Sequence, residues 1–121
     1  MVSKKAKKYC EKIEEEFQTN IDYNVLELVD SVADAISYKF GYLLYLIAPN
    51  LFGEKEFNVV SWYINPKQRN FKNFMKIQRD IKKLAKDSGC RYIKQYSHLN
   101  PKLNRWLEKV GYTVSEYKKE I

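Results

Sequence analysis

A row of cationic side chains is the most regular chemical pattern in the sequence. Arg69 comes first, and the residues that we call the basic ridge follow it at steps of three and four: Lys72, Lys76, Arg79, Lys83 and Lys86. This spacing places the row along one side of a helix. Only Asp80 and Asp87 interrupt its positive charge, so the ridge is suited to phosphates or to an acidic protein. An ordinary solvated helix face has a similar composition, so both interpretations stay open.

Residues suited to acid–base or nucleophilic chemistry are few. His98 is the only histidine, and Glu56 precedes an apolar run; both are weak catalytic candidates. Cys10 and Cys90 match no metal or redox spacing, so we expect free thiols and predict no metal site.

The cationic row lies within a predicted strand–helix–strand–helix series. The elements, in order, are a strand at 57–64, a helix at 71–85, a strand at 91–96, a helix at 100–111 and a strand at 113–117. Apolar residues at three- and four-residue steps give the first helix a stripe that can pack on a sheet. A strand–helix–strand unit of this length predicts parallel strands.

Two helices and a strand are predicted before this series. The first helix spans 2–17, and the second has its buried stripe from Val25 to Ile36, with Asp22 or Asn24 as the N-terminal cap. A strand at 38–48 follows, with Gly41 at a bend. Residues 51–56 then form a hairpin connection, so this strand should be antiparallel to the next.

Length and composition indicate one globular domain, residues 1–121. The chain has no apolar run long enough to cross a membrane and no apolar stretch typical of a signal peptide, so we expect an intracellular protein without membrane contact. Residues 1–56 have a net charge of −3, whereas residues 57–121 have +10. The basic half predicts an acidic partner, either protein or nucleic acid.

Three segments within residues 41–117 resemble the GNAT (Gcn5-related N-acetyltransferase) superfamily. They are the Pro-x-x-Arg turn from Pro66, the Gly-Cys-Arg-Tyr-Ile segment from Gly89, and Asn-x-x-Leu-x-x-Trp-Leu-Glu-Lys-Val-Gly-Tyr from Asn100. The resemblance implies an α/β (α+β) fold with a mixed central sheet flanked by helices, in the order α-α-β-β-α-β-α-β. Because the family's first strand would precede residue 2, it also implies an N-terminally shortened version.

In the family, the turn before the long helix holds the pyrophosphate of acetyl-CoA through backbone N–H groups and the helix N-terminus. If acetyl-CoA binds, the resemblance implies these cofactor-binding residues: Arg69, Asn70, Lys72, Asn73 and Asn100. Lys72 and Phe74 replace two small residues, and we expect Phe74 either to fill space that a phosphate needs or to point the loop elsewhere. Leu107 replaces the tyrosine that protonates the departing thiolate.

These departures favour a degenerate GNAT-fold protein that binds a partner through the basic ridge rather than catalysing acetyl transfer. The short acetyltransferase-like proteins of bacteriophages, of the internal virion type, look similar, which implies the bacterial host cytoplasm or the virion as its location. Two alternatives stay open: an acetyl-CoA-dependent N-acetyltransferase of a small-molecule or protein amine, and a nucleic-acid-binding α/β module. An exposed edge strand at 113–117 would allow an oligomer.

Overall fold

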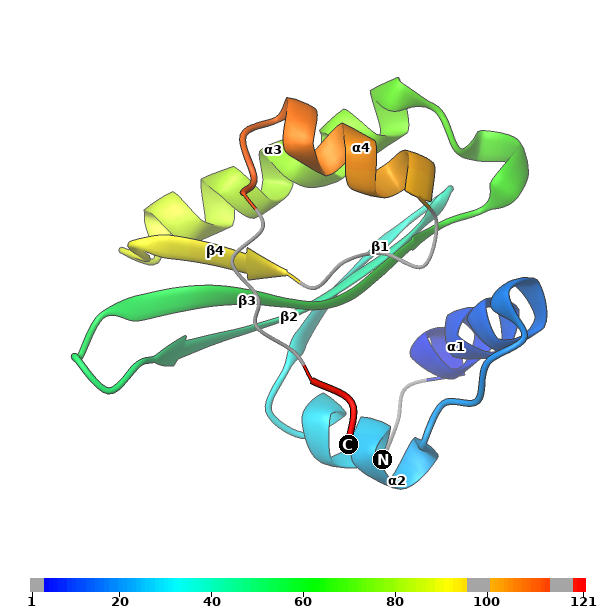
Figure 1. The fold of residues 1–121 in the computed structure, drawn as a ribbon, viewed down its shortest axis with the longest axis horizontal. Helices are drawn as coiled ribbons and strands as arrows, with labels where there is room; N and C mark the ends of the chain where they lie inside the picture. Colours follow the sequence, from blue (N-terminus) through cyan, green and yellow to red (C-terminus); the bar gives the residue numbers. More distant parts are fainter. Residues whose placement is uncertain (1–3, 96–100, 114–118) are drawn as a thin grey trace.

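The computed structural model describes residues 4–95, 101–113 and 119–121, which form a four-stranded sheet with helices on both sides (Figure 1). The strands are β1 (Asp34–Tyr38), β2 (Gly41–Pro49), β3 (Lys55–Ile64) and β4 (Tyr92–Gln95), in that order across the sheet. β2 is antiparallel to both β1 and β3, whereas β4 is parallel to β3. The predicted fold class, a mixed sheet flanked by helices, is confirmed.

The helices belong to two pairs on opposite faces of the sheet (Figure 1). They are α1 (Lys4–Phe17), α2 (Tyr23–Asp30), α3 (Phe71–Asp87) and α4 (Pro101–Lys109), with a short 3₁₀ helix, η1 (Pro66–Gln68), before α3. α1 and α2 lie on one face, and α3 and α4 on the other. The elements follow one another as predicted, with β1 as an additional strand.

The larger apolar core lies between the sheet and the α3–α4 pair. Its buried side chains are Leu43, Phe57, Val59, Trp62, Ile64, Phe74, Ile77, Ile81, Ala85, Leu103 and Leu107. The α3 members recur at three- and four-residue steps, so one side of the helix faces the sheet. This orientation turns the opposite, cationic side of α3 to solvent.

The second core, beneath α1 and α2, is smaller and rich in tyrosine. It contains Tyr9, Cys10, Leu26, Tyr42, Leu44 and Tyr63. The rings of Tyr9 and Tyr42 stack with their centroids 4.9 Å apart, and the Cys10 Sγ atom lies 3.8 Å from the Tyr42 hydroxyl. Both cysteines are free thiols, as predicted.

The second helix is shorter than predicted, which corrects one part of the sequence interpretation. α2 ends at Asp30 instead of continuing to Ile36, and residues Asp34–Tyr38 form β1. Asp22 is the cap, since its carboxylate accepts hydrogen bonds from the N–H groups of Asn24 and Val25. Pairing with β1 satisfies backbone groups of β2 that a helix would leave without partners. This tertiary requirement outweighed the helical spacing of the apolar residues.

Gly41 begins β2 after a turn that divides the predicted 38–48 strand. A Cβ atom at this position would lie 1.8 Å from the Tyr63 carbonyl oxygen, so a larger residue would force the two strands apart. Glycine is therefore required by the close approach of β3.

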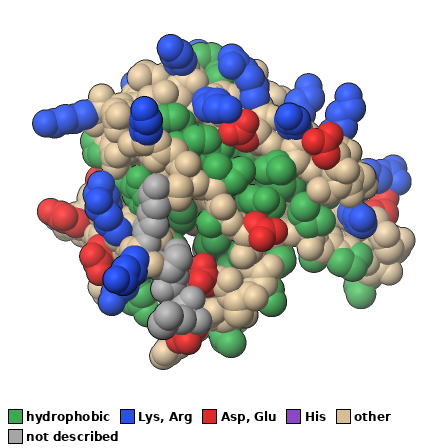
Figure 2. Space-filling model, turned by 180° about the vertical axis from the view of Figure 1, so that it is seen from behind, with side chains coloured by type: hydrophobic (Ala, Val, Ile, Leu, Met, Phe, Trp, Pro, Cys, Tyr) green, Lys and Arg blue, Asp and Glu red, His purple; other side chains and the backbone are tan. Residues whose placement is uncertain are grey.

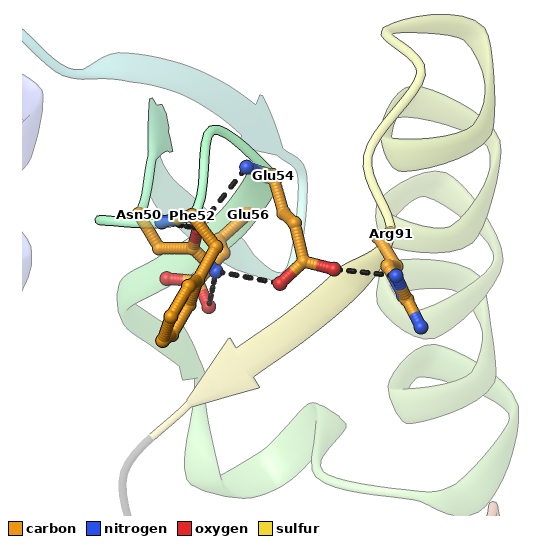
Figure 3. Close-up of polar contacts among 5 residues, drawn as sticks. All are labelled: Asn50, Phe52, Glu54, Glu56 and Arg91. Carbon is orange, nitrogen blue, oxygen red and sulfur yellow. Dashed lines mark hydrogen bonds and ion pairs between the residues drawn. The ribbon is translucent and has the colours of Figure 1, made fainter.

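The β2–β3 hairpin is held by Asn50 (Figure 3). Its side-chain oxygen accepts from the N–H groups of Phe52 and Glu54, at 2.9 and 3.0 Å, and its amide nitrogen donates to Glu54 and Glu56. Glu54 also pairs with Arg91, at the start of β4. The predicted antiparallel connection is confirmed.

The C-terminal part agrees with prediction where it is described. β4 and α4 occupy the expected regions, and α4 ends two residues before Gly111, which has φ of 102°. Of the strand predicted at 113–117, residues 114–117 lie outside the described residues, and Thr113 has no strand pairing. No described helix combines the length and the apolar character needed to cross a membrane.

Candidate functional site

The described part of β4 pairs with the first half of β3. This pairing runs from Glu56 with Tyr92 to Val59 with Gln95, and Gln95 is the last residue described before 101. Val60 is an extra residue on β3, because Ser61 opposes Leu44 and Val59 opposes Tyr45. Such a bulge bends a strand, and bulges are frequent beside binding sites. The Val60–Ile64 half of β3 pairs with β2 on one edge, and on its other edge it pairs with none of the described residues of β4; we call this second edge, with the end of β4 at Gln95, the fork.

The fork and the turn that follows β3 are the candidate site. In sheets with parallel strands, ligands commonly bind beyond the carboxyl ends of the strands, where helix N-termini also point. Here β3 leads through η1 into the N-terminus of α3. The site therefore has the backbone arrangement that can receive an extended, anionic ligand.

Aromatic side chains pack beside the fork, and one of them, Trp62, links β3 to β4. The Trp62 indole nitrogen donates to the Gln95 side-chain oxygen at 3.1 Å, which joins β3 to the end of β4. The Phe74 ring lies 5.7 Å from that of Trp62 and 5.4 Å from that of Trp106, between centroids. Phe74 is fully buried. The expectation that it fills the phosphate space is wrong, because the phase of α3 turns its side chain into the core.

Asn70 and Asn73 form hydrogen bonds that hold the turn before α3 in its conformation. Asn70 caps α3, accepting a hydrogen bond from the N–H of Asn73 at 2.9 Å. The Asn73 side chain donates in turn to the Gln68 carbonyl oxygen at 2.7 Å. Whether these asparagines also bind a cofactor stays a prediction.

Arg69 does not extend towards solvent from the turn. Its guanidinium donates to both carboxylate oxygens of Glu16 on α1, at 2.7 and 2.9 Å, and to the Ile64 carbonyl oxygen at 2.7 Å. It also lies over the Tyr63 ring, 5.4 Å from the centroid, and the Tyr63 hydroxyl donates to Glu16 at 2.8 Å. The Arg69 side chain is only 10% exposed. This arginine therefore fastens α1 to the turn.

The pKa values around this pair follow from the contacts. The hydrogen bond to Glu16 raises the pKa of Arg69, so the guanidinium stays charged. Burial, assisted by the hydrogen bond to Glu16, raises the pKa of Tyr63 to about 12. Tyr63 is therefore a neutral hydrogen-bond donor at physiological pH, and its geometry supports the ion pair rather than proton transfer.

The basic ridge is exposed along its whole length. The five cationic side chains that define it all lie on the solvent side of α3, and Figure 2 shows Lys and Arg side chains along the upper rim, over this helix. Lys76 pairs with Asp80 at 3.1 Å, and Asp80 also accepts from the Tyr38 hydroxyl at 2.6 Å. The sequence pattern thus corresponds to a real cationic surface.

The two catalytic candidates differ in what the structure says of them. Glu56 is at the opposite end of β3 from the α3 N-terminus, eight residues before Ile64, or about 26 Å at the usual strand rise. Its carboxylate is held by Asn50 and by Lys94, at 3.3 and 3.1 Å. His98 lies outside the described residues, as does Asn100. Leu107 is buried in the core.

Sequence reasoning missed Glu16 and Gln95 as residues of this region. Glu16 lies 53 positions from Arg69, and Gln95 lies 33 from Trp62, so no local spacing connects them. The only available signal was the acidic C-terminal half of α1, which has no cation in its last turn. Among the described residues, no group of His, Cys, Asp and Glu could hold a metal ion.

Comparison with known structures identifies the architecture. A candidate acetyl transferase from Pyrococcus furiosus superposes with a TM-score of 0.73 at 16% identity, covering 94% of this chain and 91% of that protein. A possible acetyltransferase from Clostridium difficile 630 gives 0.70 at 16% identity, with coverage of 96% and 86%. The chain has the GNAT fold.

A third structure with the GNAT fold, ribosomal-protein-alanine N-acetyltransferase from Brucella melitensis, gives a TM-score of 0.65 at 13% identity, covering 93% of this chain and 86% of that protein. No protein-family model matches the sequence, and no curated protein matches it. At these identities the likeness concerns the fold alone, so the function has to be argued from the side chains described above.

Proposed function

We propose that this chain is a GNAT-fold binding protein, which recognises an acidic macromolecule through the basic ridge of α3 and does not transfer acetyl groups. One contrast carries the proposal: Arg69, the arginine of the turn before α3, is only 10% exposed and is held in an ion pair with Glu16, whereas the ridge cations are exposed. A charge that is already paired and desolvated contributes little to binding an anion, whereas exposed cations attract one over several ångströms.

The proposed loss of catalysis has further support in the residues around the turn. Leu107 stands where the resemblance expects a proton donor, and its side chain is buried. Glu56, the carboxylate on β3, lies at the other end of the strand. Neither side chain meets the geometric requirement for a catalytic acid or base, which is hydrogen-bond reach of the reacting group.

Titration calorimetry with acetyl-CoA tests the catalytic half of the proposal. We expect no heat of binding up to about 1 mM cofactor, which corresponds to less than about 4 kcal/mol of affinity. Micromolar binding that Lys72→Ala weakens would overturn the proposal, since Lys72 is the exposed cation in the first turn of α3.

A charge-reversal series tests the binding half. The triple variant Arg79→Glu, Lys83→Glu and Lys86→Glu should abolish retention on a polyanionic matrix at low salt, and wild-type retention should fall steeply as salt rises. The matched control is Lys4→Glu, Lys7→Glu and Lys8→Glu on α1, which changes the net charge equally at exposed positions. Equal losses in the two variants would indicate general charge attraction and would refute the proposal that the basic ridge is the binding surface.

The second candidate function is an acetyl-CoA-dependent N-acetyltransferase, and the fork favours it. The bulge at Val60 and the edge of the Val60–Ile64 half of β3 that no described residue of β4 pairs with provide backbone groups that an amide-containing ligand could use. Phe74, turned into the core, leaves the first turn of α3 unobstructed by its ring. The calorimetric experiment distinguishes the two functions.

The chemical nature of the acidic partner and the biological source are also part of the proposal. An acidic protein and a nucleic acid would both suit the exposed cations, and their salt dependence in binding assays would differ with the number of contacts. The phage virion assignment rests on the sequence resemblance alone. Detection of the chain in purified virions by mass spectrometry would test it.

A further inference from the structure

The α2 helix has an unusual surface, remote from the basic ridge and on the other face of the sheet (Figure 1). Only Leu26 of this helix is buried. Val25, Leu28 and Val32, by contrast, are 53%, 72% and 64% exposed. Their spacing of three and four residues aligns them on one side of α2 and the turn after it. This row of apolar side chains, which we call the α2 stripe, has no use in the proposed function.

Along the sequence, the charge on both sides of the α2 stripe has a single sign. Residues 13–38 contain no Lys or Arg and seven acidic residues, of which Glu16 pairs with Arg69: Glu14, Glu15, Glu16, Asp22, Glu27, Asp30 and Asp34. Asp22 caps the start of α2, and Asp30 is its last residue. Acidic groups therefore lie at both ends of the apolar row.

The acidic groups are also placed against the helix dipoles. The C-terminus of a helix has a partial negative charge that cations stabilise. At α1 this charge is met by Arg69, which pairs with Glu16, but α2 has no basic residue in its last turn and ends in Asp30. The C-terminal end of α2 is thus suited to a cationic partner, whose apolar side chains would cover the stripe.

We propose that α2 docks a cationic amphipathic helix, whose apolar side chains pack on the α2 stripe and whose Lys or Arg side chains meet the acidic residues at both ends. A helix supplies both requirements, since apolar residues at steps of three and four leave its flanks for charge. This surface does not depend on the proposed function of the ridge, because the two lie on opposite faces of the sheet.

A second copy of this chain fits the α2 stripe less well than a cationic amphipathic helix does, because the stripe needs a partner with cations and apolar side chains on one surface. α3, which has the basic ridge, has one exposed apolar side chain, Phe71, and its other apolar residues pack towards the core. A partner must offer cations and apolar groups together, which a separate basic amphipathic segment does.

Fluorescence anisotropy with a labelled synthetic peptide of Leu and Lys in helical alternation tests the proposal. Wild type should bind it at low salt, and Leu28→Ser with Val32→Ser should weaken binding about tenfold, equivalent to about 1.4 kcal/mol. Asp30→Asn with Asp34→Asn should weaken binding and reduce its salt dependence. Circular dichroism should be unchanged, because the substituted side chains are largely exposed.

The matched control is Leu51→Ser with Phe52→Ser, at the tip of the β2–β3 hairpin, where the two side chains are fully and 87% exposed. This variant should bind the peptide as wild type does. A peptide with the same composition but its leucines spread around the helix should bind weakly. Absence of wild-type binding, or equal losses in the stripe and hairpin variants, would overturn the proposal. Concentration-dependent self-association that only the stripe variant abolishes would also overturn it, in favour of a second copy.

Discussion

The two faces of the sheet are held by different forces. Beneath α3 and α4, eleven buried side chains form one continuous apolar core. Beneath α1 and α2 there are six, with further apolar side chains partly buried around them. Polar contacts add to this smaller core: Glu16 with Arg69, Tyr23 with Glu14, and Lys12 with Asn65. The first pair of helices is thus held by a smaller apolar core together with side-chain hydrogen bonds, and the second by a larger apolar core.

This difference separates two possible functional surfaces. α3 buries four of its seven apolar side chains and presents cations, whereas α2 buries one and presents apolar groups among acids. Stability measurements on both faces would show how independent the two surfaces are, since polar anchors and apolar cores respond differently to substitution and to pH.

The largest effect should come from the α3 core. Phe74→Ala removes a fully buried ring from contact with Trp62 and Trp106, and should cost about 3–5 kcal/mol in the free energy of unfolding. Leu26→Ala, in the smaller core, should lie near the lower limit for such changes, about 2 kcal/mol. Urea unfolding followed by circular dichroism measures both.

Phe71→Ala is the matched control for Phe74→Ala, because the Phe71 ring is 45% exposed on the same helix. It should cost much less than Phe74→Ala. Equal costs for the two would mean that α3 is not oriented as described, and the contrast between the two faces would fail.

The phase of α3 could be read from the sequence, and it decided the position of Phe74. The apolar spacing placed Phe74 in the buried stripe, and the structure agrees. The motif comparison gave the opposite expectation, because it assigns a position along the chain without regard to the direction of the side chain. Helical phase is the stronger argument, since a residue cannot face both the core and a bound phosphate.

The missed features depend on contacts between distant segments. The spacing of Val32, Ala33 and Ile36 continues that of α2 and predicts helix as far as Ile36, and only pairing with β2 makes a strand at β1 more favourable. The pairing of Glu16 with Arg69 joins residues 53 positions apart. The fork likewise depends on how far β4 pairs with β3. No local pattern contains this information.

A smaller loss should follow from Glu16→Gln, which tests the polar anchoring of α1. The substitution keeps the shape of the side chain but removes the charge that Arg69 contacts through two nitrogens. Hydrogen bonds to charged groups contribute about 1.5–3 kcal/mol, so a loss of this order is expected. Hydrogen exchange should quicken in α1 more than in α3, because the pair joins α1 to the turn.

Lys76→Ala provides the comparison for an exposed ion pair. The Lys76 side chain is 55% exposed, so loss of its contact with Asp80 should cost less than about 1 kcal/mol. If Glu16→Gln and Lys76→Ala cost the same, the pair of Glu16 with Arg69 does not anchor α1, and the proposal that Arg69 is unavailable to an anion loses its basis.

The smallest effect should appear as a pH dependence at the α1–α2 junction. The Glu14 carboxylate accepts hydrogen bonds from the Tyr23 hydroxyl at 2.6 Å and from the Ile21 N–H at 3.0 Å. These bonds lower the pKa of Glu14 below its ordinary value of 4.5. A carboxylate whose pKa is lower in the folded state stabilises that state above the unfolded pKa, and the stabilisation is lost as pH falls through the folded pKa.

Glu14→Gln should therefore be less stable than wild type at about pH 7, and the difference should shrink as pH is lowered from about 4.5 towards 3. Urea unfolding of both proteins across this range measures the difference directly. Glu15→Gln, at an exposed neighbouring position of α1, serves as the control and should follow wild type more closely. A Glu14→Gln difference that stays constant down to about pH 3 would show that the Tyr23 and Ile21 contacts do not hold the carboxylate in its charged form, and that the α1–α2 pair is held by its small apolar core alone.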